Sequence, residues 1–170
     1  MVDAMLNRRA TLTLLSGSVV APRMAFAASA REITWDDLLP PGLPYSEIIG
    51  EGEMDEANDV WIPIYDANAV KLNEDLDGAY IKMPGYIIPF DVGAEGVTNF
   101  MLVPYIGACL HTPPPPANQL VMVNSAQPWP GDQLWDPVWV TGTMRTQLQN
   151  TNLGQTVYSI SADEMEVYEW

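Results

Sequence analysis

Proline and glycine interrupt this chain so often that long helices are excluded. The 170 residues include 15 prolines and 12 glycines. A proline inside a helix removes a hydrogen bond and clashes with the preceding turn, and clusters of proline and glycine mark turns. The chain therefore favours short strands joined by turns. No stretch approaches the roughly 18–20 consecutive apolar residues that a membrane-spanning helix requires, and the length predicts one compact domain.

The first thirty residues have the pattern of a cleaved signal peptide. A basic segment at residues 7–9 precedes an apolar run at residues 12–21, and two small-x-small sites follow. We expect cleavage after Ala27 or Ala30 and a periplasmic location. The adjacent arginines match the twin-arginine signal only in part, so the general secretory route stays open. No cysteine lies at the cleavage site, so we expect no membrane anchor.

The charge balance excludes whole classes of partner. The full chain has 22 acidic and 7 basic residues and a formal net charge of −15. Removing residues 1–30 leaves 21 acidic and 4 basic residues, a net charge of −17. Such a surface repels phosphate groups, so nucleic acid and anionic lipid are excluded as partners. The same charge suits solubility and attracts cations weakly.

Residues 31–78 form an irregular acidic arm, which we expect to pack on the rest of the domain. A short helical segment is expected after Thr34, which has the residue type of a helix N-cap, and it ends before Pro40. Trp35 and Leu39 are the side chains expected to pack this arm against the core of the domain. The acidic run at residues 51–59 contains almost no apolar side chains, which predicts a solvated loop.

Residues 79–170 have the pattern of a small β-domain. Two proline-interrupted segments predict one long strand, bent near Pro84-Gly85. Further strands are predicted at residues 99–105, 119–123, 137–144 and 156–161, and residues 164–168 could extend the last. Five short strands with turn signals between them indicate an OB-like five-stranded barrel, with a β-sandwich as the alternative.

One loop contains the only cysteine and the only histidine of the chain, Cys109 and His111. In extended backbone, residues two positions apart point to the same side, so these side chains can face one site. Four prolines follow at residues 113–116. They predict a polyproline II rod of roughly 9 Å that lies at the surface, because proline does not fit inside a sheet.

Three interpretations of Cys109 and His111 remain open. They could bind zinc or copper, with carboxylates from neighbouring loops completing the ligand set. Alternatively His111 could activate Cys109 as the nucleophile of a cysteine-dependent enzyme, although no third residue has a sequence spacing that identifies it as the group that orients His111. In the third interpretation both are structural: Cys109 is a small buried side chain, and His111 fastens the proline loop with a hydrogen bond.

Two other patterns carry less information. Residues 73–78 imitate the opening of a calcium loop, but its twelfth position is Pro84, which cannot supply the bidentate carboxylate. The tryptophans are mainly core or loop anchors. Trp129 and Trp135 are the better candidates for an exposed role, because turn residues surround Trp129.

The loop motif resembles a known bacterial family. The run from Gly107 through Cys109, His111 and the four prolines to Asn118, together with the strands around it, is similar to the exported family DUF3299, a family of unknown function, over residues 33–168. The resemblance implies an OB-like fold and no established activity. Some members are associated with envelope transport and metal homeostasis.

We therefore expect an exported accessory or binding protein rather than an enzyme. Cys109 and His111 are its candidate metal ligands, and Tyr105 and Asn118 are its candidate ligand-binding residues. The partner would be a metal ion or an envelope protein. In a further alternative, the chain is a structural interaction domain whose proline rod docks into an aromatic groove of that protein.

Overall fold

A computed structural model describes residues 29–56, 60–90, 92–107, 113–130, 135–151 and 154–169. Strands dominate these residues: β1 (Arg31–Glu32), β2 (Glu53–Asp55), β3 (Val60–Ile62), β4 (Tyr80–Pro89), β5 (Val97–Val103), β6 (Val121–Trp129), β7 (Pro137–Thr151) and β8 (Gly154–Val167). The helices are short 3-10 turns: η1 (Trp35–Leu38), η2 (Ala67–Val70), η3 (Glu74–Leu76) and η4 (Ala117–Gln119). Within the part of the chain that the structure describes, none of these turns could cross a membrane.

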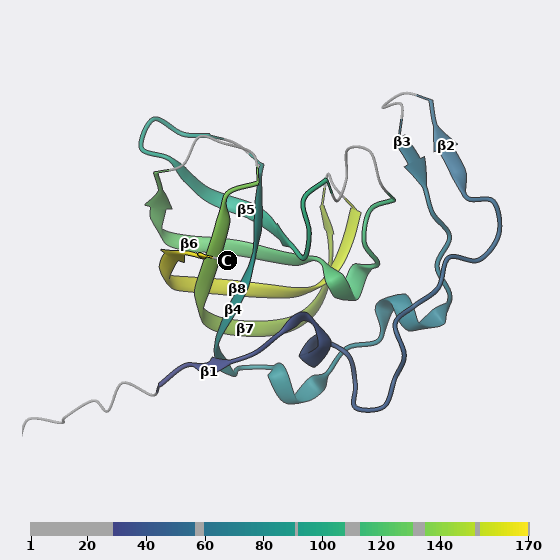
Figure 1. Cartoon of the computed structure of the whole chain (residues 1–170), viewed down its shortest axis with the longest axis horizontal. Helices are drawn as coiled ribbons and strands as arrows, with labels where there is room; N and C mark the ends of the chain where they lie inside the picture. The colour runs from purple at the N-terminus through teal and green to yellow at the C-terminus, as the bar shows by residue number, and fades with distance from the viewer. Residues whose placement is uncertain are drawn as a thin grey trace, which may run out of the picture.

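The strands from β4 to β8 close into a mixed barrel (Figure 1). Their order is β4-β5-β6-β8-β7, and β7 pairs back onto β4. The β6–β8 pair is parallel and the other pairs are antiparallel, while β1 adds a short parallel strand beside β4. The predicted OB-like five-stranded barrel is therefore confirmed for the described residues, and the β-sandwich alternative is wrong.

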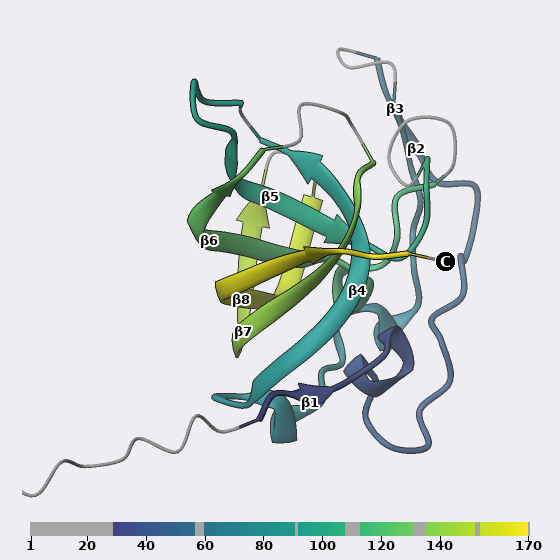
Figure 2. The same ribbon diagram turned by 60° about the vertical axis from the view of Figure 1, so that its left-hand side comes forward.

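Strand β4 closes the barrel by changing partners along its length. It pairs with β7 from Tyr80 to Tyr86 and with β5 from Tyr86 to Pro89. Figure 2 shows β4 as a long curved strand that crosses the barrel, with β1 beside its first residues. Within β4, a Cβ atom on Gly85 would lie 2.7 Å from the side chain of Leu102 and 3.0 Å from that of Trp35, so a larger residue there would require these side chains to shift. The predicted single long strand across Pro84-Gly85 is confirmed, and its pairing with β7 continues without a bulge from Tyr80 to Tyr86.

Apolar side chains are buried on both faces of β4 and β5. Ile87 and Leu102 belong to the main core inside the barrel. Their neighbours Tyr86, Ile88 and Met101 form a second cluster on the other face. This double burial explains why alternation along the strands does not show which face is the core.

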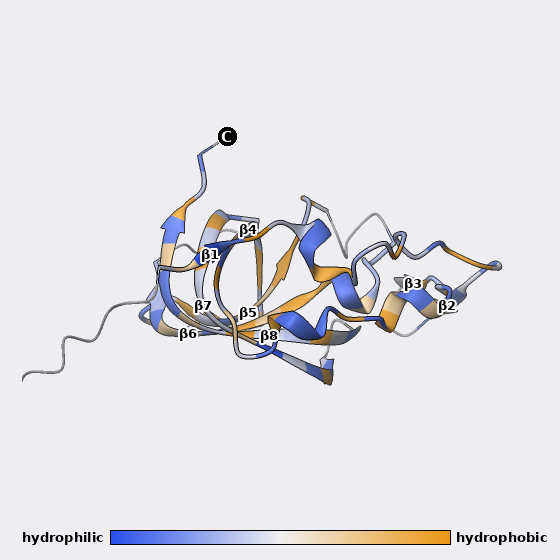
Figure 3. Cartoon of the chain, turned by 90° about the horizontal axis from the view of Figure 1, so that it is seen from below, coloured by the Kyte–Doolittle hydropathy of each residue, from blue (hydrophilic) through white to orange (hydrophobic). Residues whose placement is uncertain are grey.

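The arm of residues 31–78 contains more regular structure than the sequence predicts. Glu53–Asp55 pairs with Val60–Ile62 as the β2–β3 hairpin, which stands apart from the barrel in Figure 1. The prediction that residues 51–59 form a loop was wrong for residues 53–55, because backbone pairing with the following apolar segment compensates for poor strand composition. Figure 3 shows hydrophilic residues on the short helices and hydrophobic residues within the barrel strands.

Two polar contacts fix the start of the arm. The Thr34 backbone N–H donates to the Asp37 carboxylate at 2.8 Å, which caps η1. Trp35 Nε1 donates to the carbonyl oxygen of Pro84 on β4 at 2.9 Å. The η1 turn is thus held directly against β4, the strand that closes the barrel.

Tyr158 on β8 joins two segments of the arm to the barrel. Its buried hydroxyl donates to the carbonyl oxygen of Leu38 and accepts from the backbone N–H of Asn73, the latter at 2.6 Å. Burial raises the pKa of Tyr158 to about 12, against a smaller opposing effect of the Asn73 hydrogen bond. The neutral hydroxyl is the form that the fold stabilises.

Alkaline pH should therefore destabilise the protein in part through Tyr158. An unfolded tyrosine ionises near pH 10 (about its ordinary pKa), so the free energy of unfolding should fall as pH rises from about 10 towards 12. In Tyr158→Phe this fall should be shallower, while the unpaired Leu38 and Asn73 groups lower stability at pH 9 by about 1–3 kcal/mol. Urea unfolding of both proteins at pH 9 and pH 11 measures this. Equal pH dependence in the two proteins would contradict the assignment.

Candidate functional site

Two tyrosines hold the described end of the proline loop. The Tyr65 hydroxyl donates to the carbonyl oxygen of Pro114 at 2.9 Å, and the Tyr105 hydroxyl donates to that of Pro113 at 3.5 Å. Burial, and to a smaller extent the nearby Tyr105, raises the pKa of Tyr65. Tyr65 therefore remains a protonated donor at neutral pH and ties the proline loop to the arm.

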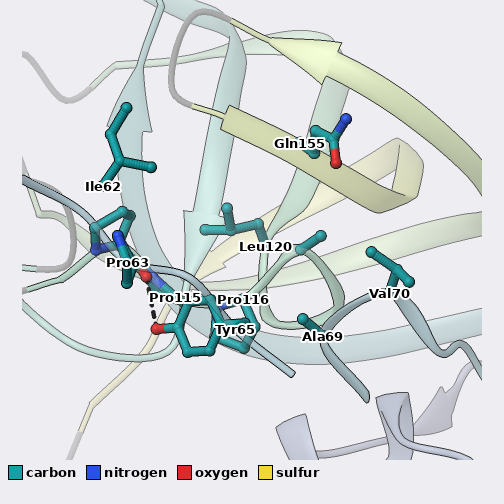
Figure 4. Close-up of a pocket in the computed structure, with 11 residues that line it drawn as sticks. Ile62, Pro63, Tyr65, Ala69, Val70, Pro115, Pro116, Leu120 and Gln155 are labelled. Carbon is teal, nitrogen blue, oxygen red and sulfur yellow. Dashed lines mark hydrogen bonds between the residues drawn. The ribbon is translucent and has the colours of Figure 1, made fainter. Parts of the chain in front are cut away.

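An apolar groove lies between the proline loop and the arm (Figure 4). Its volume is about 380 Å³. Prolines 114–116 line one side, Ile62, Tyr65 and Val70 line the arm side, and Leu120 lies at the start of β6. Gln155, at the start of β8, supplies a side-chain amide. The shape and lining suit a small molecule with a largely apolar surface.

Asn118, a predicted ligand-binding residue, is fully buried behind the groove lining. Its side-chain Nδ2 donates to the carbonyl oxygens of Asn68 and Lys71, each at 2.8 Å. Within the described residues, its Oδ1 accepts no hydrogen bond. Asn118 thus joins η4 to η2, and it shapes the groove through its neighbour Ala117, which lines it.

Of the other predicted site residues, the structure describes only Tyr105. Tyr105, 43% exposed, contacts the proline loop but does not line the groove. Cys109 and His111 lie outside the described residues, so their assignment as metal ligands stays a prediction. Across the described ranges, no three histidine, cysteine, aspartate or glutamate side chains are grouped as a metal site would require.

The arm side of the groove is the part that the sequence analysis missed. Ile62, Tyr65 and Val70 follow an acidic run that gives no sign of a binding surface. The apolar segment of residues 61–65 was an available signal. Its partner, the proline loop, lies about fifty positions away in sequence, as the 49-residue separation of Tyr65 and Pro114 shows. Sequence spacing does not reveal such a contact.

Asn118 should be important for stability despite its small size. Replacing it by alanine leaves two backbone carbonyl oxygens without their donor, so Asn118→Ala should lower the free energy of unfolding by about 1–3 kcal/mol. The matched control is Asn124→Ala on β6, whose side chain is exposed, with an expected change within about 0.5 kcal/mol. Urea unfolding measures both variants. A similar small change in both would show that the two carbonyl contacts contribute little.

Comparisons with known proteins agree with the fold. Residues 35–167 match the family model described as "Protein of unknown function (DUF3299)". A crystal structure of a DUF3299 family protein from Pseudomonas aeruginosa PAO1 has 35% sequence identity to this chain and a TM-score of 0.66, and the match covers 84% of this chain and 98% of that one. A search of curated proteins found no match. The resemblance inferred from the proline-loop motif is confirmed: this chain belongs to the DUF3299 family.

Proposed function

We propose that this protein is an exported, non-enzymatic binding protein that holds a small, largely apolar molecule in the groove beside the proline loop. The observation that carries this proposal is the apolar groove itself, with a volume of about 380 Å³. That size falls within the roughly 300–1,000 Å³ of small-molecule sites in proteins.

Preorganisation supports the groove as a binding site. Proline residues have a fixed φ angle, so a proline side of the groove loses little conformational entropy when a ligand binds. The Tyr65–Pro114 hydrogen bond fixes the distance between the two sides. The bound molecule would therefore meet a surface that needs little rearrangement.

The alternatives have less support. Docking of the proline rod into another protein would require its free surface, but Pro115 is buried and Pro114 is half-buried against this chain. The enzyme alternative depends on Cys109 and His111 alone, because the described groove lining supplies no carboxylate, imidazole or thiol. The signal-peptide pattern of residues 1–30 supports export to the periplasm.

Binding in the groove can be tested with a neutral apolar fluorophore, N-phenyl-1-naphthylamine. We expect saturable binding that Ile62→Asp weakens about tenfold or more, because a charge at the groove must be desolvated when the probe binds. The control is Ile64→Asp, which makes the same change at a side chain of similar exposure, 44% against 47% for Ile62, that does not line the groove. Fluorescence titration measures the affinities. Equal affinities in the two variants would contradict this proposal.

A second proposed function is binding of zinc or copper by Cys109 and His111. The supporting observation is chemical: a soft thiolate and an imidazole, each unique in the chain, stand two residues apart in one loop. Carboxylates from other loops would complete the ligand set.

Metal binding should raise the melting temperature by mass action. At a free Zn²⁺ or Cu⁺ concentration one hundred times the dissociation constant, the stabilisation is about 2.7 kcal/mol. Cys109→Ser and His111→Ala should each abolish the shift, whereas Ile62→Asp should retain it. Differential scanning calorimetry with and without metal, followed by chelator removal, measures the effect. An unchanged shift in the two ligand variants would exclude this site.

A further inference from the structure

A second cavity opens at the rim of the barrel, at the opposite end of β6 from the proline loop. Leu120, beside the apolar groove, precedes β6, whereas Gln127 and Trp129 at its other end line this cavity. Its volume is about 640 Å³. Ligand sites often occupy barrel mouths. Its described lining shares no residue with that of the groove.

The strand register places side chains from three parts of the barrel at this rim. Ser125 on β6 pairs with Ala162 on β8, which pairs with Gly142 on β7, which pairs with Ile81 on β4. These four residues form one row across the barrel. Ser125 in this row lines the cavity, together with Tyr80, which adjoins Ile81 of the row, and with Asp163 and Glu164, which follow Ala162 on β8.

A β-bulge directs the acidic side chains of β8 to this rim. Thr141 pairs with Glu164 and Gly142 pairs with Ala162, so Asp163 is the extra residue. The backbones approach so closely that a Cβ atom on Gly142 would lie 2.1 Å from the carbonyl oxygen of Ser161. Bulges are enriched at barrel rims and beside binding sites, where they redirect side chains.

The aromatic side chains offer apolar surface and ring faces. Trp129 is half-buried and packs against the barrel core, as does Met165. Trp129 Nε1 donates to the Asp136 carboxylate at 3.0 Å, so its polar atom already has a partner. What Trp129 contributes to the cavity is therefore indole surface, and Tyr80 adds a second ring.

The charges at the cavity are of one sign. Among the described residues that line it, the charged ones are Asp163 and Glu164, both exposed. Lys82 interacts electrostatically with Glu164: the pKa of Lys82 is raised mainly by its hydrogen bond to Glu166, with a smaller effect of Glu164 in the same direction. Lys82 is paired with Glu166 and lies 5.3 Å from the centre of the Trp139 ring. It therefore does not neutralise both rim carboxylates.

We propose that this rim cavity binds an aliphatic diamine or polyamine. The ammonium groups would pair with Asp163 and Glu164, and the aliphatic chain would lie against Trp129 and Tyr80. Carboxylates favour ammonium groups through charge-assisted hydrogen bonds, and aromatic faces attract cations. The net charge of −15 further raises the local concentration of cations.

The test uses cadaverine (1,5-diaminopentane) and, as its uncharged analogue, 1,5-pentanediol. At low ionic strength, isothermal titration calorimetry should show one saturable site for cadaverine and no binding of the diol. The double variant Asp163→Asn/Glu164→Gln should weaken cadaverine binding about tenfold or more, and Trp129→Phe by a smaller factor. Near-UV circular dichroism verifies that each variant is folded.

Glu53→Gln on the β2–β3 hairpin is the matched control, because it removes one exposed carboxylate far along the chain from this cavity. Its affinity for cadaverine should equal that of the unaltered protein, and so should that of the single variant Glu164→Asp, which keeps the charge, within about threefold. Absence of cadaverine binding, equal binding of the diol, or an equal loss in Glu53→Gln would each overturn the proposal.

Discussion

Closure of the barrel depends on one strand, β4, which pairs with β7 along its first part and with β5 along its last part. Strand β4 exchanges β7 for β5 at Tyr86, and the preceding Gly85 leaves room for the side chains of Leu102 and Trp35. Trp35 also donates its indole hydrogen bond to Pro84. The contact that permits closure of the barrel therefore also attaches the arm. Tyr158 adds a second attachment from inside the barrel, through Leu38 and Asn73.

Attachment of the arm has a consequence for binding. Contacts of Trp35, Leu38 and Asn73 hold the arm against the barrel at three points. Tyr65, which lies between Leu38 and Asn73 in sequence, is thereby held beside the proline loop, with which it forms a hydrogen bond. A groove between two loops would ordinarily be a poor binding site, since loops are the more mobile parts of a fold. Here one side is built of proline and the other is hydrogen-bonded to it. The groove gains rigidity from covalent geometry and from contacts with the barrel.

Sequence reasoning predicted the parts of the fold that depend on local chemistry. The β-rich runs, the single long strand across Pro84-Gly85 and the OB-like barrel follow from residue types and turn signals. The second half of β7 was missed, because residues 145–151 are mostly polar and their pairing rests on backbone hydrogen bonds. The extension of the last strand at residues 164–168 lies within β8 as far as Val167. The rim bulge was missed too, since Gly142 marks a close approach only once its partner strand is known. The partner of Tyr65 depends on tertiary contact alone.

The two proposed cavities have different chemistry because they use different ends of the same strand. At the start of β6, the carbonyl oxygen of Pro114 is already paired with Tyr65, so an apolar molecule would displace little bound water from polar groups. At the end of β6, the rim carboxylates remain exposed, and a cation could pair with them while keeping part of its hydration. Screening acts over about 8 Å at physiological salt and weakens exposed charge pairs without affecting apolar burial. The two proposals thus assign a neutral ligand to one end of β6 and a cation to the other, and each site would respond to a different property of the solution.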